Sequence, residues 1–306
     1  MFTKPIRRMI RDLHLDKTSG ASELIKAALE ILKAQLDSIK NPYMDIKDII
    51  LELSRELLNV RPSMAPIINT IGYFFHDLKS YTKKDLLERY INFPQKREKR
   101  ENVLLSYFHS FLNNYKGKHL NVMLISYSTT IIKCLKEAKT KNFTFYILEA
   151  RPLLEGRRTA EILSSDFETH LITDSSMGKF IDSIDIVLLG IDSILRDGSI
   201  VNKIGSHPLA CIAADNNKEV YAIGDSYKYN LKSHFGQEII VEDKPIYEVY
   251  SKKIKKKLFH VHNYYFDTTP SKYLNGIISD LGVLAIPDFL KEVVNTIPLD
   301  WFKSFL

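Results

Sequence analysis

Five short apolar runs, separated by segments with helical periodicity, constrain the fold of this chain more than any other feature. Strands that are apolar throughout and alternate with helices are typical of a parallel sheet covered on both faces. The sequence therefore predicts a Rossmann-like, doubly wound, mainly parallel α/β fold. The runs are "NVMLIS" (121–126), "FTFYILEA" (143–150), "ETHLITD" (168–174), "DIVLLG" (185–190) and "EVYAIG" (219–224).

The first third of the chain has a different pattern and reads as helices. Apolar residues recur every three or four positions in 19–40 and in 45–60, where Arg61-Pro62 stops the second segment. One or two further helices are expected over 83–114. We therefore predict an all-helical N-terminal domain over 1–116 and a Rossmann-like domain over 117–306, joined by the stretch "YKGKHL".

The charge balance is only mildly basic. Lys and Arg number 43 against 37 Asp and Glu, which gives a net charge of +6 over 306 residues. This excess is too small to indicate direct binding of nucleic acid. The one dense basic run, "SKKIKKKLFH" at 251–260, is typical of a solvated surface segment, and the role of Lys252 to Lys257 stays open.

Cysteine, histidine and hydropathy patterns narrow the class of protein further. Cys134 and Cys211 lack the spacing of a disulfide framework or a zinc site, and His260 and His262 have no third metal ligand nearby. No apolar run approaches the roughly 20 residues of a membrane span, and the first residues lack the apolar core of a signal peptide. We expect a cytoplasmic protein with no cofactor, no metal and no membrane partner.

Polar clusters follow all five predicted strands. Ligands of such sheets bind beyond the carboxyl ends of the strands, so these clusters should converge on one crevice, although turns and caps also favour Asp and Ser. Arg151, directly before a proline, offers a fixed guanidinium fork to a carboxylate or phosphate. The clusters are Ser126-Tyr127-Ser128, Glu149-Ala150-Arg151-Pro152, Asp174-Ser175-Ser176, Asp192 and Asp225-Ser226.

Other candidate site residues stand on short motifs. The small residues Ser19-Gly20-Ala21 at a helix start allow backbone N–H groups to approach an anion, or simply cap the helix. Asp192 comes two residues after an apolar strand, where partial burial is expected to raise its pKa into a range useful for proton transfer. Asn202 and Lys203 are suited to orienting a hydroxyl and neutralising a phosphate.

Four ordered segments, with "SGASELIKAAL" and "RPSMAPIIN" near the front, resemble a known family over nearly the whole chain. They are "ILEARPLLEGRRTAEIL", "GIDSILRDGSIVNKIGSHPLACIAA", "VYAIGDSYKYN" and "FDTTPSKYLNGIISDLGVL". The family joins the alpha, beta and delta regulatory subunits of eukaryotic translation initiation factor 2B with isomerases of methylthioribose 1-phosphate and ribose 1,5-bisphosphate. The resemblance implies a helical N-terminal domain, a Rossmann-like C-terminal domain that forms dimers, and an anion site between the domains.

The resemblance matches individual residues of this chain to site residues of the family. Asp192 matches the catalytic aspartate of the isomerases, Asn202 and Lys203 match their substrate-binding Asn-Lys pair, and Arg61 matches an arginine that contacts substrate.

The chain also departs from the isomerases. Ser126 and Ile125 stand where they have the catalytic cysteine and a histidine; Ser19 replaces the arginine before Gly-Ala, and Glu155 replaces a glutamine. A serine hydroxyl is far less acidic than a thiol. Ser126-Tyr127-Ser128 instead resembles the Gly-Tyr-Ser of the regulatory subunits.

Our leading hypothesis is a non-catalytic, alpha-type regulatory subunit or close homologue. It predicts a homodimer through the C-terminal domain, partnership with other initiation factor 2B subunits and phosphorylated initiation factor 2, and a crevice for a sugar phosphate or nucleotide. The alternative is an aldose–ketose isomerase of a ribose phosphate, with Asp192 as general acid and base, Ser126 as a weak stabiliser, and Arg151, Asn202 and Lys203 as ligand contacts. A ligand sensor outside translation is the third possibility.

Overall fold

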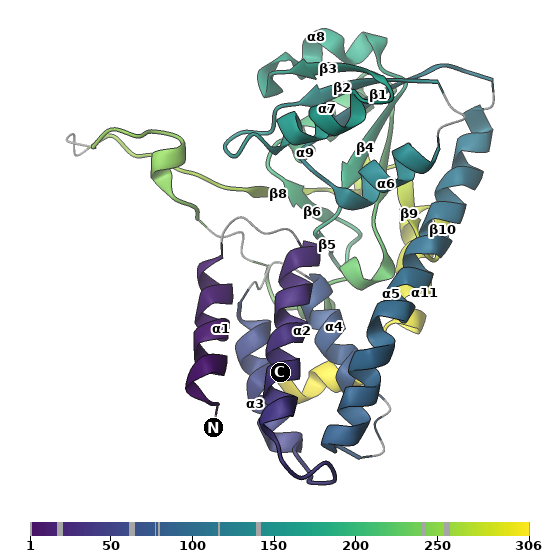
Figure 1. The fold of residues 1–306 in the computed structure, drawn as a ribbon. Coiled ribbons are helices and arrows are strands. Elements are labelled where there is room, and N and C mark those ends of the chain that lie inside the picture. The colour runs from purple at the N-terminus through teal and green to yellow at the C-terminus, as the bar shows by residue number, and fades with distance from the viewer. Residues whose placement is uncertain are drawn as a thin grey trace.

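The computed structural model describes residues 2–16, 21–60, 65–76, 78, 80–115, 117–138, 142–239, 243–253 and 258–305. Helices from the first third of the chain form one part of the molecule, and a sheet with helices on its faces forms the other (Figure 1). The predicted fold class is therefore confirmed.

The helical part contains two helices that the sequence pattern did not reveal. In α1, the apolar residues Ile6, Ile10 and Leu13 form a narrow buried stripe, and a proline stands in the first turn. Nearly every described side chain of α4 is buried, so α4 lacks the polar face that makes a helix recognisable. The bounds are α1 Lys4–Leu15, α2 Ala21–Ser38, α3 Lys47–Leu58, α4 Ala65–Phe75 and α5 Lys83–Leu112.

Helix α5 connects the two parts of the molecule. It runs unbroken through Pro94, and its first turn is capped by the side chain of Thr82, which accepts a hydrogen bond from the Asp85 N–H. Its last turns bury Leu104 and Phe108 in the same cluster as the strands of the sheet. The helix therefore places the residues of its middle turns at the junction between the two parts.

All five predicted strands are confirmed, and two more extend the sheet. The order is β10-β9-β7-β4-β1-β2-β3, with every pair parallel except β9 and β10. The chain moves from β1 to β3 in one direction and then from β4 to β9 in the other, so the topological switch point lies between β1 and β4. The strands are β1 Leu120–Ile125, β2 Phe143–Leu148, β3 Glu168–Ile172, β4 Ile186–Gly190, β7 Glu219–Ile223, β9 Gly276–Ser279 and β10 Gly282–Leu284.

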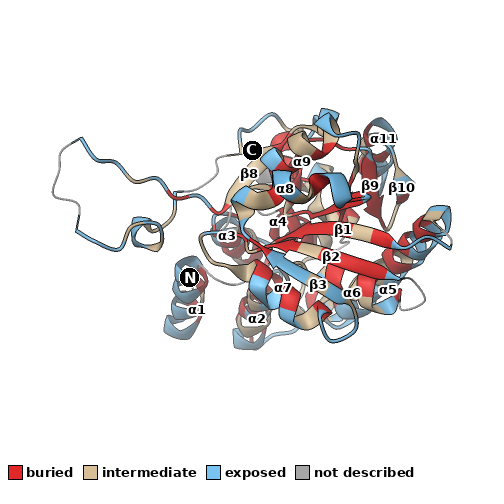
Figure 2. Cartoon of the chain, turned by 90° about the horizontal axis from the view of Figure 1, so that it is seen from above, coloured by how far each residue is buried: buried red, intermediate tan, exposed pale blue. Residues whose placement is uncertain are grey.

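Helices cover both faces of this sheet. One face packs on α5, α6 and α7, and the other packs on α9 and α11 and continues into the helical part. Seen from above, the central strands are buried, whereas the edge strand β3 is largely exposed (Figure 2). The helices are α6 Thr129–Glu137, α7 Glu155–Leu163, α8 Met177–Phe180, α9 Ser206–Asp215, α10 Leu231–His234 and α11 Ile286–Thr296.

A small antiparallel sheet, which the sequence did not predict, lies beside the main one. It has the order β5-β6-β8 and consists of β5 Ser193–Ile194, β6 Ile200–Lys203 and β8 Phe266–Thr269. Strand β6 carries Asn202 and Lys203. This sheet therefore determines where two of the predicted site residues lie.

The C-terminal segment returns to the helical part. The ring of Trp301 stacks on Phe75 of α4, with ring centroids 6.0 Å apart, and one hydrophobic cluster includes residues of both parts. The hydrophobic core is thus continuous across residue 116, where the sequence pattern changes. Within the described part of the chain, no helix combines the length and apolarity that crossing a membrane requires.

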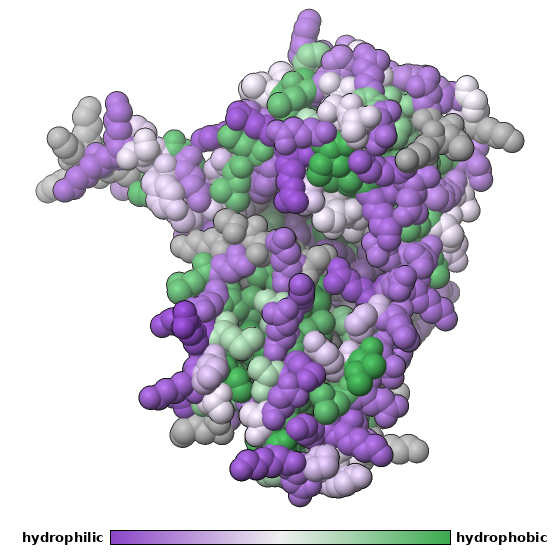
Figure 3. Space-filling view, viewed as in Figure 1, coloured by the Kyte–Doolittle hydropathy of each residue, from purple (hydrophilic) through white to green (hydrophobic). Residues whose placement is uncertain are grey.

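An arm between α10 and β8 stands away from the body (Figures 1 and 3). Its described residues include the short helix Ile246–Glu248 and several exposed apolar side chains: Ile246, Tyr247, Val249 and Leu258. The described residues of the basic run, 251–253 and 258–260, lie on this arm, and residues 254–257 are outside the described ranges.

Candidate functional site

A crevice of about 530 Å³ lies at the carboxyl ends of the strands, between the sheet and the helical part. We call its two sides the sheet wall and the helix wall. The helix wall consists of Glu23, Ile25, Pro66, Thr70, Phe93, Arg97, Arg100, Glu101 and Leu104. The sheet wall consists of residues 125–130, 153–155, 158, 190–192, 202, 203, 223, 225, 227, 228, 265 and 266.

The turn from β1 into α6 brings Ser126 to the crevice. Ser126 has a positive φ of 68°, a conformation that costs a residue with a side chain roughly 1–2 kcal/mol. Its carbonyl oxygen accepts a hydrogen bond of 2.7 Å from the Thr159 hydroxyl, which holds the turn in place. Two residues later, Ser128 caps α6 by accepting from the Ile131 N–H.

The start of α7 brings Glu155 against Lys203 of β6. The Lys203 Nζ donates to Glu155 Oε1 at 2.8 Å, and the lysine side chain is only 4% exposed. The ammonium also lies 5.2 Å from the centre of the Tyr265 ring. The other carboxylate oxygen, Glu155 Oε2, is buried with no hydrogen-bond partner among the described residues. The lysine of the Asn-Lys pair is therefore already neutralised.

Asp192 lies directly after β4 and is partly buried. Its backbone N–H donates to the Val201 carbonyl at 2.9 Å, which ties it to β6. Burial raises the pKa of its carboxyl group above the ordinary value; the positive charges of Lys228 and Lys203 oppose this rise, and Glu155 adds to it. This direction agrees with the one expected from the sequence, and a carboxyl group of this kind is suited to proton transfer.

Asn202 is buried and held by its own strand connection. Its Nδ2 donates to Ser206 Oγ at 3.0 Å, and that hydroxyl donates to the Lys203 carbonyl at 2.7 Å. A Cβ at Gly190 would lie 3.3 Å from Asn202 Oδ1 and 3.4 Å from Ser128 Cβ. The glycine at the end of β4 therefore allows the side chains of two neighbouring segments to approach one another.

The structure brings most of the predicted site residues together but not all. Ser126, Tyr127, Ser128, Glu155, Asp192, Asn202 and Lys203 line the same crevice.

Arg151 does not line the crevice. It is exposed, and its guanidinium donates to the carbonyl of Glu248 on the arm at 3.0 Å. The Arg151 and Ala150 N–H groups both bind the Asp174 carboxylate, which fixes this turn. Ser19, Gly20 and Arg61 lie outside the described residues, as does the side chain of Ala21.

Several residues of the crevice were not predicted. Arg97 and Arg100 come from the middle of α5, and Lys228 follows β7. Two arginines stack on tyrosines that follow strands: Arg158 lies 4.2 Å from the Tyr127 ring centre, and Arg100 lies 3.6 Å from that of Tyr227. The sequence did contain a signal for the α5 residues, because their spacing places four of them on one face of the helix: Phe93, Arg97, Arg100 and Leu104.

The crevice mixes both signs of charge. Its acidic residues are Glu23, Glu101, Glu155, Asp192 and Asp225, and its basic residues are Arg97, Arg100, Arg158, Lys203 and Lys228. Such a lining suits a ligand that carries both an anionic group and hydroxyl groups. In the described ranges, His, Cys, Asp and Glu side chains form no group of three that could hold a metal ion.

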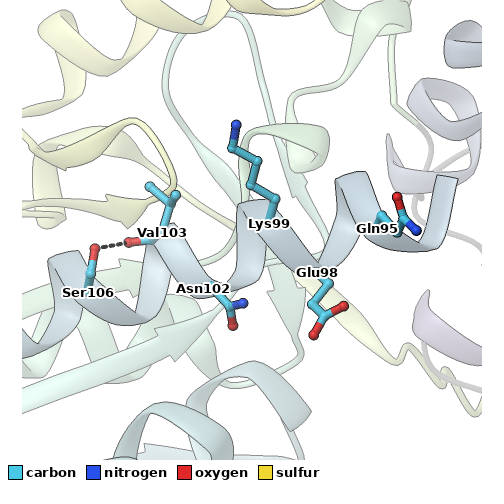
Figure 4. Close-up of a pocket in the computed structure, with 6 residues that line it drawn as sticks. All are labelled: Gln95, Glu98, Lys99, Asn102, Val103 and Ser106. Carbon is cyan, nitrogen blue, oxygen red and sulfur yellow. Dashed lines mark hydrogen bonds between the residues drawn. The ribbon is translucent and has the colours of Figure 1, made fainter. Parts of the chain in front are cut away.

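A second, shallow pocket of about 410 Å³ lies on the outer face of α5. Figure 4 shows that its side chains diverge: Lys99 points to one side of the helix, and Glu98 and Asn102 point to the other. The one hydrogen bond drawn there joins Ser106 Oγ to the Val103 carbonyl of the same helix at 2.7 Å. These groups do not converge on a ligand, so the crevice is the stronger candidate site.

Comparison with known proteins finds relatives of both kinds that the sequence suggested, initiation-factor-like proteins and sugar-phosphate isomerases. The model of the "Initiation factor 2 subunit family" matches residues 17–286. A "Putative translation initiation factor eIF-2B subunit 2-like" protein from Pyrococcus horikoshii is 27% identical over 94% of this chain and 99% of its own length. A "Ribose 1,5-bisphosphate isomerase" from Methanocaldococcus jannaschii is 29% identical over 78% of this chain and 77% of its own length.

Solved structures share the fold. The crystal structure of the translation initiation factor eIF-2B from Pyrococcus horikoshii has a TM-score of 0.79 and 25% identity, and the match covers 94% of this chain and all of that one. A chain of the tetrameric eIF2B-beta2-delta2 complex from C. thermophilum has a TM-score of 0.73 at 15% identity, with 92% of both chains covered.

Proposed function

The chain belongs to the initiation factor 2 subunit family, and we propose that it acts as a non-catalytic regulatory subunit of the initiation factor 2B type. In this proposal the crevice binds a sugar phosphate or a nucleotide, and binding changes the stability or association of the protein without converting the ligand. The family has both initiation-factor-like and isomerase relatives, so the residues of the crevice have to distinguish the two activities.

The ion pair between Glu155 and Lys203 is the observation that carries this proposal. On the family resemblance, Lys203 occupies the place of a substrate-binding lysine and Glu155 the place of a neutral glutamine. In this chain the Nζ and Oε1 atoms are 2.8 Å apart. A carboxylate at that position competes with a substrate phosphate for the lysine. Ser126 supports the same conclusion, because a hydroxyl cannot supply the thiolate of the isomerases.

Partner proteins are the second half of the proposal. The exposed apolar side chains of the arm, Ile246, Tyr247, Val249 and Leu258, support association through the C-terminal part of the chain. We propose a homodimer formed there, with other initiation factor 2B subunits and phosphorylated initiation factor 2 as further partners, in the cytoplasm. Replacing Tyr247 and Leu258 together by serine should shift the protein to monomers in sedimentation analysis if this assignment is right.

A binding assay combined with product analysis tests the proposal. The purified protein is titrated with ribose 1,5-bisphosphate, methylthioribose 1-phosphate and nucleoside monophosphates while its melting temperature is followed. Ligand at about 100 times its dissociation constant adds about 2.7 kcal/mol of stability. We expect stabilisation without conversion to a ketose. Conversion that Asp192→Asn abolishes in a folded protein would disprove the non-catalytic role.

The isomerase alternative rests on Asp192. Its carboxyl group lines the crevice, and burial raises its pKa, which suits a group that moves a proton between neighbouring carbons of a sugar. If this alternative holds, Ser126→Cys should increase turnover, because it restores a more acidic side chain at the end of β1. No turnover in either protein would leave the regulatory proposal as the better one.

A further inference from the structure

Two polar atoms on the helix wall are buried without a hydrogen-bond partner among the described residues. They are Thr70 Oγ1 on α4 and Arg100 Nε on α5. An unpaired buried polar group destabilises the folded state, so each such group in a native protein needs an explanation. Both residues line the crevice, and Thr70 is 2% exposed. Hydrogen-bond acceptors of a ligand on the helix wall would satisfy these atoms.

The arginine is held in an orientation that favours an anion. Its guanidinium carbon lies 3.6 Å from the centre of the Tyr227 ring. Tyr227 is itself fixed, because Asn69 Nδ2 donates to its carbonyl at 2.7 Å. Stacking uses the flat face of the guanidinium and leaves its N–H edge available for the paired hydrogen bonds that phosphate accepts.

The basic residues of α5 support an anion at this position. Among the described residues Arg100 has no ion-pair partner, and Arg97 lies one helical turn away on the same face of α5. Of the acidic groups on the helix wall, Glu101 pairs with Lys133 at 3.2 Å, and Glu23 stands on α2. On the sheet wall the positive charge of Lys203 is already matched by Glu155.

Building on the proposed function, we propose that the phosphate group of the crevice ligand binds at the helix wall, to Arg100 and Thr70, and not at Lys203. The ligand then lies across the crevice, with its phosphate against α4 and α5 and its hydroxyl groups toward Glu155 and Asp192. Binding of the phosphate joins the helical part to the sheet part through the stack of Arg100 on Tyr227.

The test measures binding of ribose 5-phosphate and of inorganic phosphate to the full chain by isothermal titration calorimetry. Arg100→Gln should weaken both by about 10- to 100-fold, because it removes charge-assisted hydrogen bonds. Thr70→Val, which keeps the shape of the side chain, should weaken both by about threefold to tenfold. Lys99→Gln is the matched control: it removes one positive charge from the next residue of α5, on the outer face, and should leave both affinities within about twofold.

Each outcome decides the proposal. Unchanged affinity in a folded Arg100→Gln protein would overturn it, as would equal losses in the Lys99→Gln control or no binding by the wild type. Loss of binding in Lys203→Met with none in Arg100→Gln would place the phosphate on the sheet wall instead. If Arg100→Gln does not fold, Thr70→Val and Arg100→Lys decide between the same outcomes. Conversion of the sugar phosphate would disprove the non-catalytic role but not the subsite, which depends on the affinities alone.

Discussion

The two walls of the crevice differ in how their polar groups are satisfied. On the sheet wall, Lys203 pairs with Glu155, and Asn202 binds Ser206. The buried atom left without a partner there, among the described residues, is an acceptor, Glu155 Oε2. On the helix wall the unpaired atoms are Thr70 Oγ1 and Arg100 Nε, a hydroxyl and an N–H, both of which can donate. The two walls therefore favour opposite ends of a sugar phosphate.

This difference shows why the motif residues alone do not define the site. Asp192, Asn202 and Lys203 all line the crevice. However, the Glu155 carboxylate of α7 pairs with Lys203 and so reduces the positive charge that Lys203 presents to a ligand. A lysine paired at 2.8 Å has its charge already matched, so it attracts a phosphate less strongly than an unpaired lysine would. Arg100 on the helix wall has no such partner among the described residues. Three changes test the contrast, in order of expected effect.

Gly156→Ala should disrupt the sheet wall most strongly. A Cβ at this position of α7 would lie 1.8 Å from the Leu148 carbonyl oxygen of β2, so α7 must move away and separate Glu155 from Lys203. We expect a loss of more than about 3 kcal/mol in the free energy of unfolding, measured by denaturant titration. Gly178→Ala on α8, where a Cβ meets nothing within 4 Å, is the control and should change stability little. Equal behaviour of the two variants would contradict the close packing of α7.

Asp267→Asn should reveal the cost of a buried charge behind the sheet wall. Asp267 of β8 accepts hydrogen bonds from the Gly205 and His207 N–H groups at the start of α9, yet burial raises its pKa to about 6. Because its pKa is higher in the folded state, ionisation disfavours folding. The wild type should lose at most about 3 kcal/mol of unfolding free energy through this group as the pH rises from 4 to 7. The variant should lack this loss.

Asp85 in the helical part has a pKa shifted in the opposite direction to that of Asp267, so it is the comparison for that experiment. Hydrogen bonds from Ser80 and Thr82 lower the pKa of its carboxyl group, so ionisation favours folding. The advantage of the wild type over Asp85→Asn should therefore grow as the pH rises through the acid range and disappear when the carboxyl group is protonated. Unfolding curves of the wild type, Asp267→Asn and Asp85→Asn at several pH values measure both effects. Parallel pH profiles for wild type and Asp267→Asn would contradict the assignment.

Glu155→Gln should give the sheet wall an unpaired positive charge, as the helix wall has in Arg100 among the described residues. We expect the smallest change in stability of the three from this variant. It frees Lys203 for an anion, so inorganic phosphate at about five times the dissociation constant of the new site should add about 1 kcal/mol of stability. The double variant Glu155→Gln with Arg100→Gln should keep this gain, which Arg100→Gln alone should lack. Glu149→Gln, which removes the partner of Arg157 outside the crevice, is the control. No gain in the double variant would mean that Lys203 is not available to phosphate.

Much of the sheet side of the site was predictable from the sequence. Parallel strands end at a common edge, so the positions of Ser126, Glu155 and Asp192 follow from the strand pattern and the family resemblance. The ion pair of Glu155 with Lys203 was not predictable, because the short strand β6 that carries the lysine has no clear periodic signal. Arg151 shows the reverse: its position at a strand end suggested a ligand contact, but its guanidinium binds a carbonyl of the arm.

The sequence by itself determined the fold class, the helical first third, the five central strands and the presence of Asp192, Asn202 and Lys203 at their ends, because these depend on local periodicity and on the geometry of a parallel sheet. Only the tertiary structure decided which charges face one another. Arg100 and Tyr227 are far apart in the chain, and they meet because α5 crosses from the helical part onto the sheet. Contacts of this kind depend on how the two parts pack, which no local pattern specifies.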